Sequence, residues 1–545
     1  MKKIIGALAL AVGAGAAYGQ TTPQDLGQIH GNFQTDIQYY LPDSAIPGVI
    51  VPNEKILMNG FANLIYTKGP FSAGIRYESY LNALQGFDKR YQGNGIPYRF
   101  ATYTRGDLEV TVGNYYEQFG NGLIFRSYEE RGLGLDNAMD GVRLKYKPFR
   151  GVYLKGVYGK QRLFFAQGPG IMRGGDAEIQ LNELIGGEYN PDAFRVTIGG
   201  SVLSKFEPDL DPVYVFPENV TAGAGRISVS KGNFTIQGEY AQKINDPSAL
   251  NRFIYKNGQA LLIGANYSQK GFGFNASAKM VDNMDFRSDR AASGNVSTLN
   301  FLPPIAKQHT YLLTAFYPYA TQNLGEMGAQ AEVFYKFKKG SVLGGKYGTE
   351  IALNFSKIHG LDSVRTSSYE GYRAKFGAFG KQLYFQDINV EVTKKFSKHF
   401  KSVFTFANIK YNMEVIQGLG GKGTLNTWLG VADLTYYIND KYSIRTELHN
   451  MTVEGNHDRG SWAAALVEFS VAPKWFISVI DQYNYGNLDK TLRLHYLLGQ
   501  LTFVKDANRF ALSYGRQREG ILCVGGVCRQ VPGIYGLTLS ITSSF

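Results

Sequence analysis

Charged residues of both signs lie close together in one glycine-rich segment of the chain. Glycines at Gly120, Gly122, Gly132 and Gly134 allow compact turns, so residues 118–139 are the best candidate for a loop that folds inward. Charges that face each other across a narrow lumen set a field that sorts solutes. We therefore predict a constriction loop and adjoining wall, formed by Arg126, Glu129, Glu130, Arg131, Asp136, Asp140 and Arg143.

The same charges allow a structural interpretation, which the sequence leaves open. They could pair with one another and hold the loop rigid, or they could coat the outer surface. Asp140 and Arg143 continue the charged pattern on the wall beside the loop, where a constriction needs it. This continuation favours the functional interpretation.

Two cysteines occur in the chain, in the sequence ILCVGGVC at residues 521–528. Gly525 and Gly526 are a two-residue turn signal, and they place Cys523 and Cys528 opposite each other. We expect a disulfide, because the signal-peptide pattern at residues 1–19 indicates export to the cell envelope, which is an oxidising compartment. No histidine lies nearby to complete a metal site, so we interpret the pair as a staple of the last outer loop.

Patterns that carry catalysis do not stand out. The histidines are scattered, and GLGGKGT at residues 418–424 has Ile416 where a phosphate-binding loop has its first glycine. We therefore expect no enzyme, no cofactor and no metal site.

The last residues, GIYGLTLSITSSF, alternate between apolar and polar side chains. Apolar residues fall on one parity and Gly, Ser and Thr on the other, which predicts a strand with one lipid-facing and one wet side. The lipid-facing parity consists of Tyr535, Leu537, Leu539, Ile541 and Phe545.

Tight turns and longer polar stretches follow one another in strict rotation along the chain. Outer-membrane barrels have short turns on the periplasmic side and long loops outside, so the rotation predicts their hairpins. The tight turns are expected at 67–71, 104–108, 147–151, 190–194, 230–234, 269–273, 337–341, 395–400, 438–443, 471–475 and 505–509.

Apolar and polar residues alternate along the strands between these turns, as a barrel with a water-filled lumen requires. In residues 234–243, Phe234, Ile236 and Tyr240 oppose Gln237 and Glu239. We predict an all-β fold, a transmembrane antiparallel β-barrel whose ends both face the periplasm and whose last strand pairs with the first near residues 27–38.

The strand number depends on residues 284–326, which we interpret as holding one further turn. FLPPIAKQ at 301–308 supplies it, with Val296 to Leu302 descending and His309 to Tyr317 ascending. The barrel then has about 26 strands, with 22 to 28 as the accepted range.

The first residues have the pattern of a secretory signal peptide. Lys2 and Lys3 precede an apolar run, and Ala17-Tyr18-Gly19 forms a small-residue cleavage site. We divide the chain into a signal peptide at 1–19 and an outer-membrane barrel at 20–545. We expect no separate plug domain, because only about seven residues separate Gln20 from the first strand, fewer than a domain needs.

Two resemblances extend this interpretation. The terminal strand ending in Phe545 resembles the C-terminal signature that the barrel-assembly machinery recognises in bacterial outer-membrane proteins. Residues 113–146, with YPYATQNLGE at 317–326, resemble uncharacterised large single-chain barrels of the Bacteroidetes outer membrane. The second resemblance implies a compartment, the Gram-negative cell outer membrane, and no particular activity.

Two functional classes remain from the sequence. The first is a channel or porin-like protein narrowed by inward-folded loops, and the second is a scaffold or accessory component of a cell-envelope or secretion complex. In either case the expected partners are outer-membrane lipid, the barrel-assembly machinery during biogenesis and possible envelope proteins, with no nucleic acid.

Overall fold

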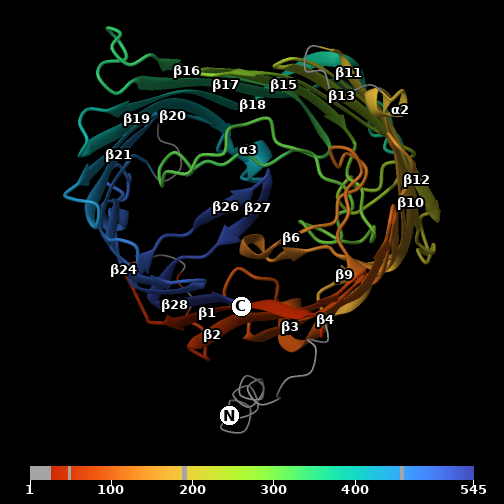
Figure 1. Cartoon of the computed structure of the whole chain (residues 1–545), viewed down its shortest axis with the longest axis horizontal. Helices are drawn as coiled ribbons and strands as arrows, with labels where there is room; N and C mark the ends of the chain where they lie inside the picture. Colours follow the sequence, from red (N-terminus) through yellow and green to blue (C-terminus); the bar gives the residue numbers. More distant parts are fainter. Residues whose placement is uncertain (1–25, 47–48, 50, 187–192, 455–459) are drawn as a thin grey trace.

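The computed structural model describes residues 26–46, 49, 51–186, 193–454 and 460–545. In this part of the chain, 24 strands form one closed antiparallel barrel, which Figure 1 shows end-on as a ring. The expected signal peptide at 1–19 lies outside the described residues. No helix among the described residues is long and apolar enough to cross a membrane.

The barrel strands run in chain order around the ring. They are β1 (Gln28–Tyr40), β2 (Ile56–Lys68), β3 (Phe71–Asn82), β4 (Gly93–Arg105), β5 (Leu108–Tyr115), β8 (Met139–Phe149), β9 (Val152–Leu163), β10 (Ala166–Gln180), β11 (Arg195–Phe206), β12 (Asn219–Lys231), β13 (Phe234–Lys243), β14 (Gly258–Gln269), β15 (Phe272–Asp282), β16 (Gly325–Phe337), β17 (Thr349–Arg365), β18 (Tyr372–Lys395), β19 (Phe400–Asn412), β20 (Thr424–Tyr437), β21 (Tyr442–Glu454), β22 (Trp462–Val471), β23 (Trp475–Tyr483), β24 (His495–Lys505), β25 (Asn508–Gln517) and β28 (Ile534–Ser544).

The remaining elements are short. Two hairpins lie outside the main sheet, and the helices are each three or four residues long. These elements are β6 (Glu129–Glu130), β7 (Leu135–Asp136), β26 (Gly520–Val524), β27 (Val527–Val531), α2 (Leu181–Leu184), α3 (Met413–Ile416), η1 (Lys89–Tyr91), η2 (Arg131–Leu133) and η3 (Lys490–Leu492).

The barrel closes where the first strand meets the last, as predicted. β1 pairs with β2 on one side and with β28 on the other, with Asp36 opposite both Asn59 and Ser540. The backbones of Gly31 and Phe545 exchange two hydrogen bonds of 2.9 and 3.0 Å beyond the end of β28. In a membrane this closure satisfies backbone groups that an open edge would leave unpaired.

The alternation predicted for the strands is confirmed in β13. Ile236 and Tyr240 are exposed on the outside, whereas Glu239, on the opposite parity, is buried in the interior. In β20, Trp428 faces outward and Asp433 inward in the same way. An apolar exterior around a polar interior suits a barrel that is surrounded by lipid.

The connections separate into two kinds at the two ends of the ring, as the turn rotation predicted. Apart from 190–194, which lies partly outside the described residues, every predicted tight turn joins neighbouring strands at one end. The long connections lie at the opposite end, which we call the loop end. Both the start of β1 and the end of β28 lie at the turn end.

The strand estimate of about 26 was too high by one hairpin, although 24 falls within the accepted range. FLPPIAKQ is no barrel turn, and residues 296–302 and 309–317 form no strands. Instead, residues 283–324 are a single connection between β15 and β16, and Leu299, Leu313 and Phe316 are buried inside the barrel. Their apolar side chains pack against the inner wall and other loops, not against lipid.

Candidate functional site

Among the described residues, three segments that fold into the interior of the barrel contact one another. They are the 116–138 loop between β5 and β8, the 283–324 loop between β15 and β16, and the inner hairpin, residues 520–531, formed by β26 and β27. Figure 1 shows β6, β26 and β27 within the ring of strands. These inner segments occupy the lumen, so we treat them as the candidate site.

The 116–138 loop is held to the wall by a buried ionic cluster. The Asp136 carboxylate accepts from the guanidinium groups of both Arg76 on β3 and Arg162 on β9. Glu78 pairs with the same two arginines, at 2.7 Å from Arg76 and 2.6 Å from Arg162. All four side chains are at most 7% exposed. Each buried charge therefore has an opposite charge in direct contact.

The loop adds a second set of ion pairs next to this cluster. Glu129 lies 3.0 Å from Arg76 and 2.7 Å from Arg131. Arg131 also donates to Gln34 on β1 at 3.1 Å and covers the Phe61 ring. Glu130 accepts a hydrogen bond of 3.3 Å from the backbone of Gly132 and caps η2.

The predicted wall residues Asp140 and Arg143 lie on β8 and are also paired. Asp140 accepts from Arg99 at 3.1 Å, and Arg143 donates to Glu109 at 2.7 Å. Arg143 additionally donates to the backbone carbonyl of Tyr116 at 3.0 Å, which ties the wall to the start of the loop.

Two titratable groups at the start of the loop respond to this environment. Burial raises the pKa of Tyr116 well above its usual value, and the neighbouring Asp136 carboxylate raises it further. Burial alone would raise the pKa of Glu117, but Lys155, which donates to it at 2.9 Å, holds that pKa below its usual value. The Glu117–Lys155 ion pair is therefore part of what fixes the loop.

Arg126 contacts the neighbouring loop instead of a carboxylate. Its guanidinium lies over the rings of Tyr128 and Phe301, at 4.3 and 4.1 Å from their centroids. The backbones of the two loops also pair, because Arg126 donates to Leu299 at 2.8 Å and Phe301 donates to Gly122 at 2.9 Å.

The predicted site residues therefore lie in one region, but their charged groups contact other parts of the protein. Among the predicted residues, those that pair with opposite charges are Glu129, Arg131, Asp136, Asp140 and Arg143. This is the structural alternative that the sequence left open. Whether any of them also meets a permeating ion stays a prediction.

The 283–324 loop extends along the inner wall from β9 to β22. Near its start, Thr298 accepts from Gln161 on β9 at 2.7 Å. Farther on, His309 lies 2.9 Å from Asp387 on β18, and Tyr311 donates to Asp433 on β20 at 3.1 Å. The Phe316 ring then packs 5.3 Å from that of Trp462 on β22. This single loop therefore covers a wide arc of the wall.

The inner hairpin crosses the space between the other two segments. Asn295 donates to the carbonyl of Cys528 at 2.7 Å, and Thr321 donates to that of Gly526 at 3.2 Å. Arg529 donates to the carbonyl of Gly132 in the 116–138 loop at 3.0 Å. Burial lowers the pKa of Arg529 from its usual value.

The predicted disulfide is present between Cys523 and Cys528, which are direct partners in the hairpin register. Gly525 and Gly526 form the tip with φ of 57° and 76°, a left-handed conformation that glycine adopts without strain. The hairpin belongs to the last loop-end connection, between β25 and β28, and this connection folds back into the barrel.

Three cavities lie along the inner hairpin. One of about 250 Å³ is lined by Val527 and Phe301 among others, and one of about 240 Å³ is lined by Leu522 and Tyr317 among others. A third, of about 160 Å³, is bordered by Arg529. Each cavity is large enough for several water molecules, so the packing between the hairpin and the loops around it is incomplete.

Sequence reasoning missed the wall partners of the loop, Arg76, Glu78 and Arg162. Arg76 and Glu78 alternate with the exposed Ile75 and Tyr77, so their position on the inner face could have been inferred. Their pairing with Asp136 could not, because it joins residues far apart in the sequence.

Solved structures with a similar fold are outer-membrane pores and receptors. The P pilus usher PapC translocation pore is 9% identical, with TM-score 0.42, covering 95% of this chain and 99% of that chain. The siderophore receptor PirA from Pseudomonas aeruginosa is 11% identical, with TM-score 0.39, covering 98% of this chain and 84% of that chain. The outer membrane protein OpdK from Pseudomonas aeruginosa is 12% identical, with TM-score 0.35, covering 78% of this chain and 98% of that chain.

Among curated protein sequences, no match to this chain is found. A sequence family described as "Family of unknown function (DUF6029)" matches residues 1–545. This large β-barrel of the outer-membrane type, with its own loops folded into the lumen, therefore belongs to that family.

Proposed function

We propose that this protein is a channel of the Gram-negative outer membrane, narrowed by its own loops, in which the inner hairpin is the movable part of the obstruction. The signal-peptide pattern at 1–19, the apolar exterior and the resemblance to Bacteroidetes barrels support this location, with both chain ends on the periplasmic side.

The observation that carries the proposal is the contrast in packing between the inner segments. Phe119, Leu123, Ile124 and Phe125 of the 116–138 loop are completely buried. By contrast, the residues of β26 and β27 are only half-buried or exposed, and three cavities border them. A segment with few buried apolar contacts opens at lower free energy than one that is part of a core.

The direct test is the conductance of the purified protein in a planar lipid bilayer. We expect discrete current steps from the wild-type protein. Each step corresponds to the hairpin moving out of the position in which it blocks the lumen. A correctly folded protein that gives no current at any voltage would contradict the channel.

A scaffold for envelope or secretion partners is the second candidate. One observation favours it: the charges of the 116–138 loop are paired with the wall, as at Asp136 and Glu129, and are not directed at a solute path. Affinity purification from cross-linked cells separates the two functions. A stoichiometric envelope partner together with an electrically silent barrel would support the scaffold.

A further inference from the structure

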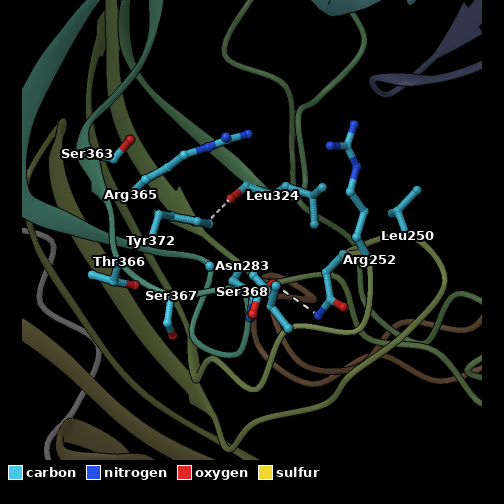
Figure 2. A pocket seen from close by; sticks show the side chains of 13 residues that line it. Leu250, Arg252, Asn283, Leu324, Ser363, Arg365, Thr366, Ser367, Ser368 and Tyr372 are labelled. Carbon is cyan, nitrogen blue, oxygen red and sulfur yellow. Dashed lines mark hydrogen bonds between the residues drawn. The ribbon is translucent and has the colours of Figure 1, made fainter. Parts of the chain in front are cut away.

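A pocket of about 810 Å³ lies at the loop end of the barrel, apart from the inner hairpin. Three parts of the chain form it: the connection 244–257 between β13 and β14, the hairpin tip between β17 and β18, and the two ends of the 283–324 loop, Asn283 and Leu324. Figure 2 shows this pocket with its lining side chains.

Two arginines line the pocket, Arg252 from the 244–257 connection and Arg365 at the end of β17. Neither the Arg252 nor the Arg365 side chain makes a hydrogen bond or ion pair with another described residue. Among the described residues that line the pocket there is also no carboxylate. In Figure 2 both guanidinium groups lie above Leu324 in the view, that of Arg365 to its left and that of Arg252 to its right.

Two acidic residues that are sequence neighbours of lining residues, Asp282 and Glu370, already have partners. Asp282, at the end of β15, lies 3.2 Å from Lys256 and accepts from the Tyr372 hydroxyl at 2.7 Å. Glu370 lies 3.2 Å from Arg373. The excess positive charge of the pocket therefore comes from Arg252 and Arg365.

The pocket is held in shape by contacts between its walls. The Tyr255 and Tyr369 rings stack with centroids 4.4 Å apart, and Tyr255 donates its backbone N–H to Tyr369 at 2.8 Å. Arg252 itself has a φ of 58°, a left-handed conformation that is costly for a residue with a Cβ. Such strain is found where a side chain is held for contact with a ligand.

The rest of the lining is suited to a small polar molecule. Ser363, Thr366, Ser367 and Ser368 supply hydroxyl groups on one side, and Leu250, Ile254 and Leu324 supply an apolar side. Arginine guanidinium groups bind oxyanions through paired, charge-assisted hydrogen bonds. The volume lies within the range of small-molecule sites and exceeds what one inorganic ion fills.

We propose that this pocket binds a sugar that carries a tetrahedral oxyanion, a phosphate or a sulfate, with Arg252 and Arg365 contacting the oxyanion. The hydroxyl groups of the β17–β18 tip then contact the sugar hydroxyls. The proposal concerns binding alone and does not depend on whether the lumen conducts.

The test is isothermal titration of the purified, detergent-solubilised full chain with four probes. These are glucose 6-phosphate, glucose 6-sulfate, glucose and inorganic phosphate, each up to millimolar concentration. We expect both charged sugars to bind at least about tenfold more tightly than glucose or phosphate alone. Glucose lacks the oxyanion that contacts the arginines, and phosphate lacks the sugar hydroxyls. Comparison of the two charged sugars identifies the preferred oxyanion.

Single variants test whether each arginine contacts the oxyanion. Arg252→Gln and Arg365→Gln should each weaken binding of the charged sugars about tenfold, and binding should weaken further as salt rises. Arg90→Gln is the matched control, because Arg90 is an exposed arginine in another loop-end connection and pairs with Asp88 at 2.7 Å. Heat-modifiable electrophoresis checks that every variant is folded.

The proposal would be overturned by equal binding of glucose and the charged sugars, by full affinity in the folded Arg252→Gln, Arg365→Gln double variant, or by no binding of either charged sugar to the folded wild-type protein. A loss of affinity in Arg90→Gln equal to that of the pocket variants would do the same.

Discussion

The 116–138 loop and the inner hairpin both lie inside the barrel, yet they are held there by different forces. The loop is fixed by buried ion pairs and a dry apolar core, with Asp136 between two arginines of the wall. The hairpin is held by hydrogen bonds to loop carbonyls and amides, by one disulfide within itself and by surfaces that leave cavities. Position inside a barrel therefore does not make a segment part of its rigid structure.

Removing the central carboxylate should produce the largest effect on stability. Among the described residues, Asp136→Asn leaves Arg76 and Arg162 with Glu78 and Glu129 as their remaining counter-charges. Breaking a buried ion pair in this way costs about 3 kcal/mol of unfolding free energy. Urea unfolding in detergent micelles measures this change.

Glu130→Gln is the control for that substitution, because the Glu130 side chain accepts a hydrogen bond from the Gly132 backbone and pairs with no opposite charge among the described residues. We expect a change of less than about 0.5 kcal/mol. Equal destabilisation by both substitutions would mean that the loop is not held by the Asp136 cluster.

Removing the disulfide should have a smaller and local effect. Cys523 and Cys528 are separated by five positions, and a loop of that length contributes about 2 kcal/mol. In the Cys523→Ser, Cys528→Ser double variant, amide exchange in 520–531 should accelerate about 30-fold. Exchange in the 116–138 loop should not change, and acceleration in both segments would show that they are one cooperative unit.

Acid should produce the smallest effect, and only in the loop. The pKa of Glu117 is lower in the folded protein, so its stabilising contribution is present above the unfolded value of about 4.3 and is lost as pH falls through the folded value. Amide exchange near residues 116–118, corrected for intrinsic rates, should rise below about pH 4. The Glu117→Gln variant should lack this response. An equal response in the hairpin would contradict the claim that the loop and the hairpin are held by different forces.

Most of the barrel could be predicted from the sequence because its signals are local. A tight turn needs only a few residues, and the alternation of Ile236, Glu239 and Tyr240 reports the two environments of one strand. Closure followed from the energetic cost of an open edge in lipid.

The interior could not be predicted in the same way. Residues 296–302 and 309–317 were interpreted as barrel strands, yet their apolar residues Leu299, Leu313 and Phe316 pack inside the barrel. An apolar pattern shows that a side chain avoids water, but it does not show whether lipid or a loop covers it. The two-glycine turn gave the hairpin and its disulfide, whereas its place in the lumen depends on distant partners such as Asn295 and Gly132.

The central claim is that the inner hairpin is the removable part of the obstruction, and single-channel conductance tests it most directly. The variant replaces residues 521–530 with a short Gly-Ser link, and a control is shortened in the exposed segment 418–422. We predict a conductance several-fold above wild type for the hairpin variant, because the lumen widens, and wild-type conductance for the control. A folded hairpin variant with unchanged conductance would contradict the account.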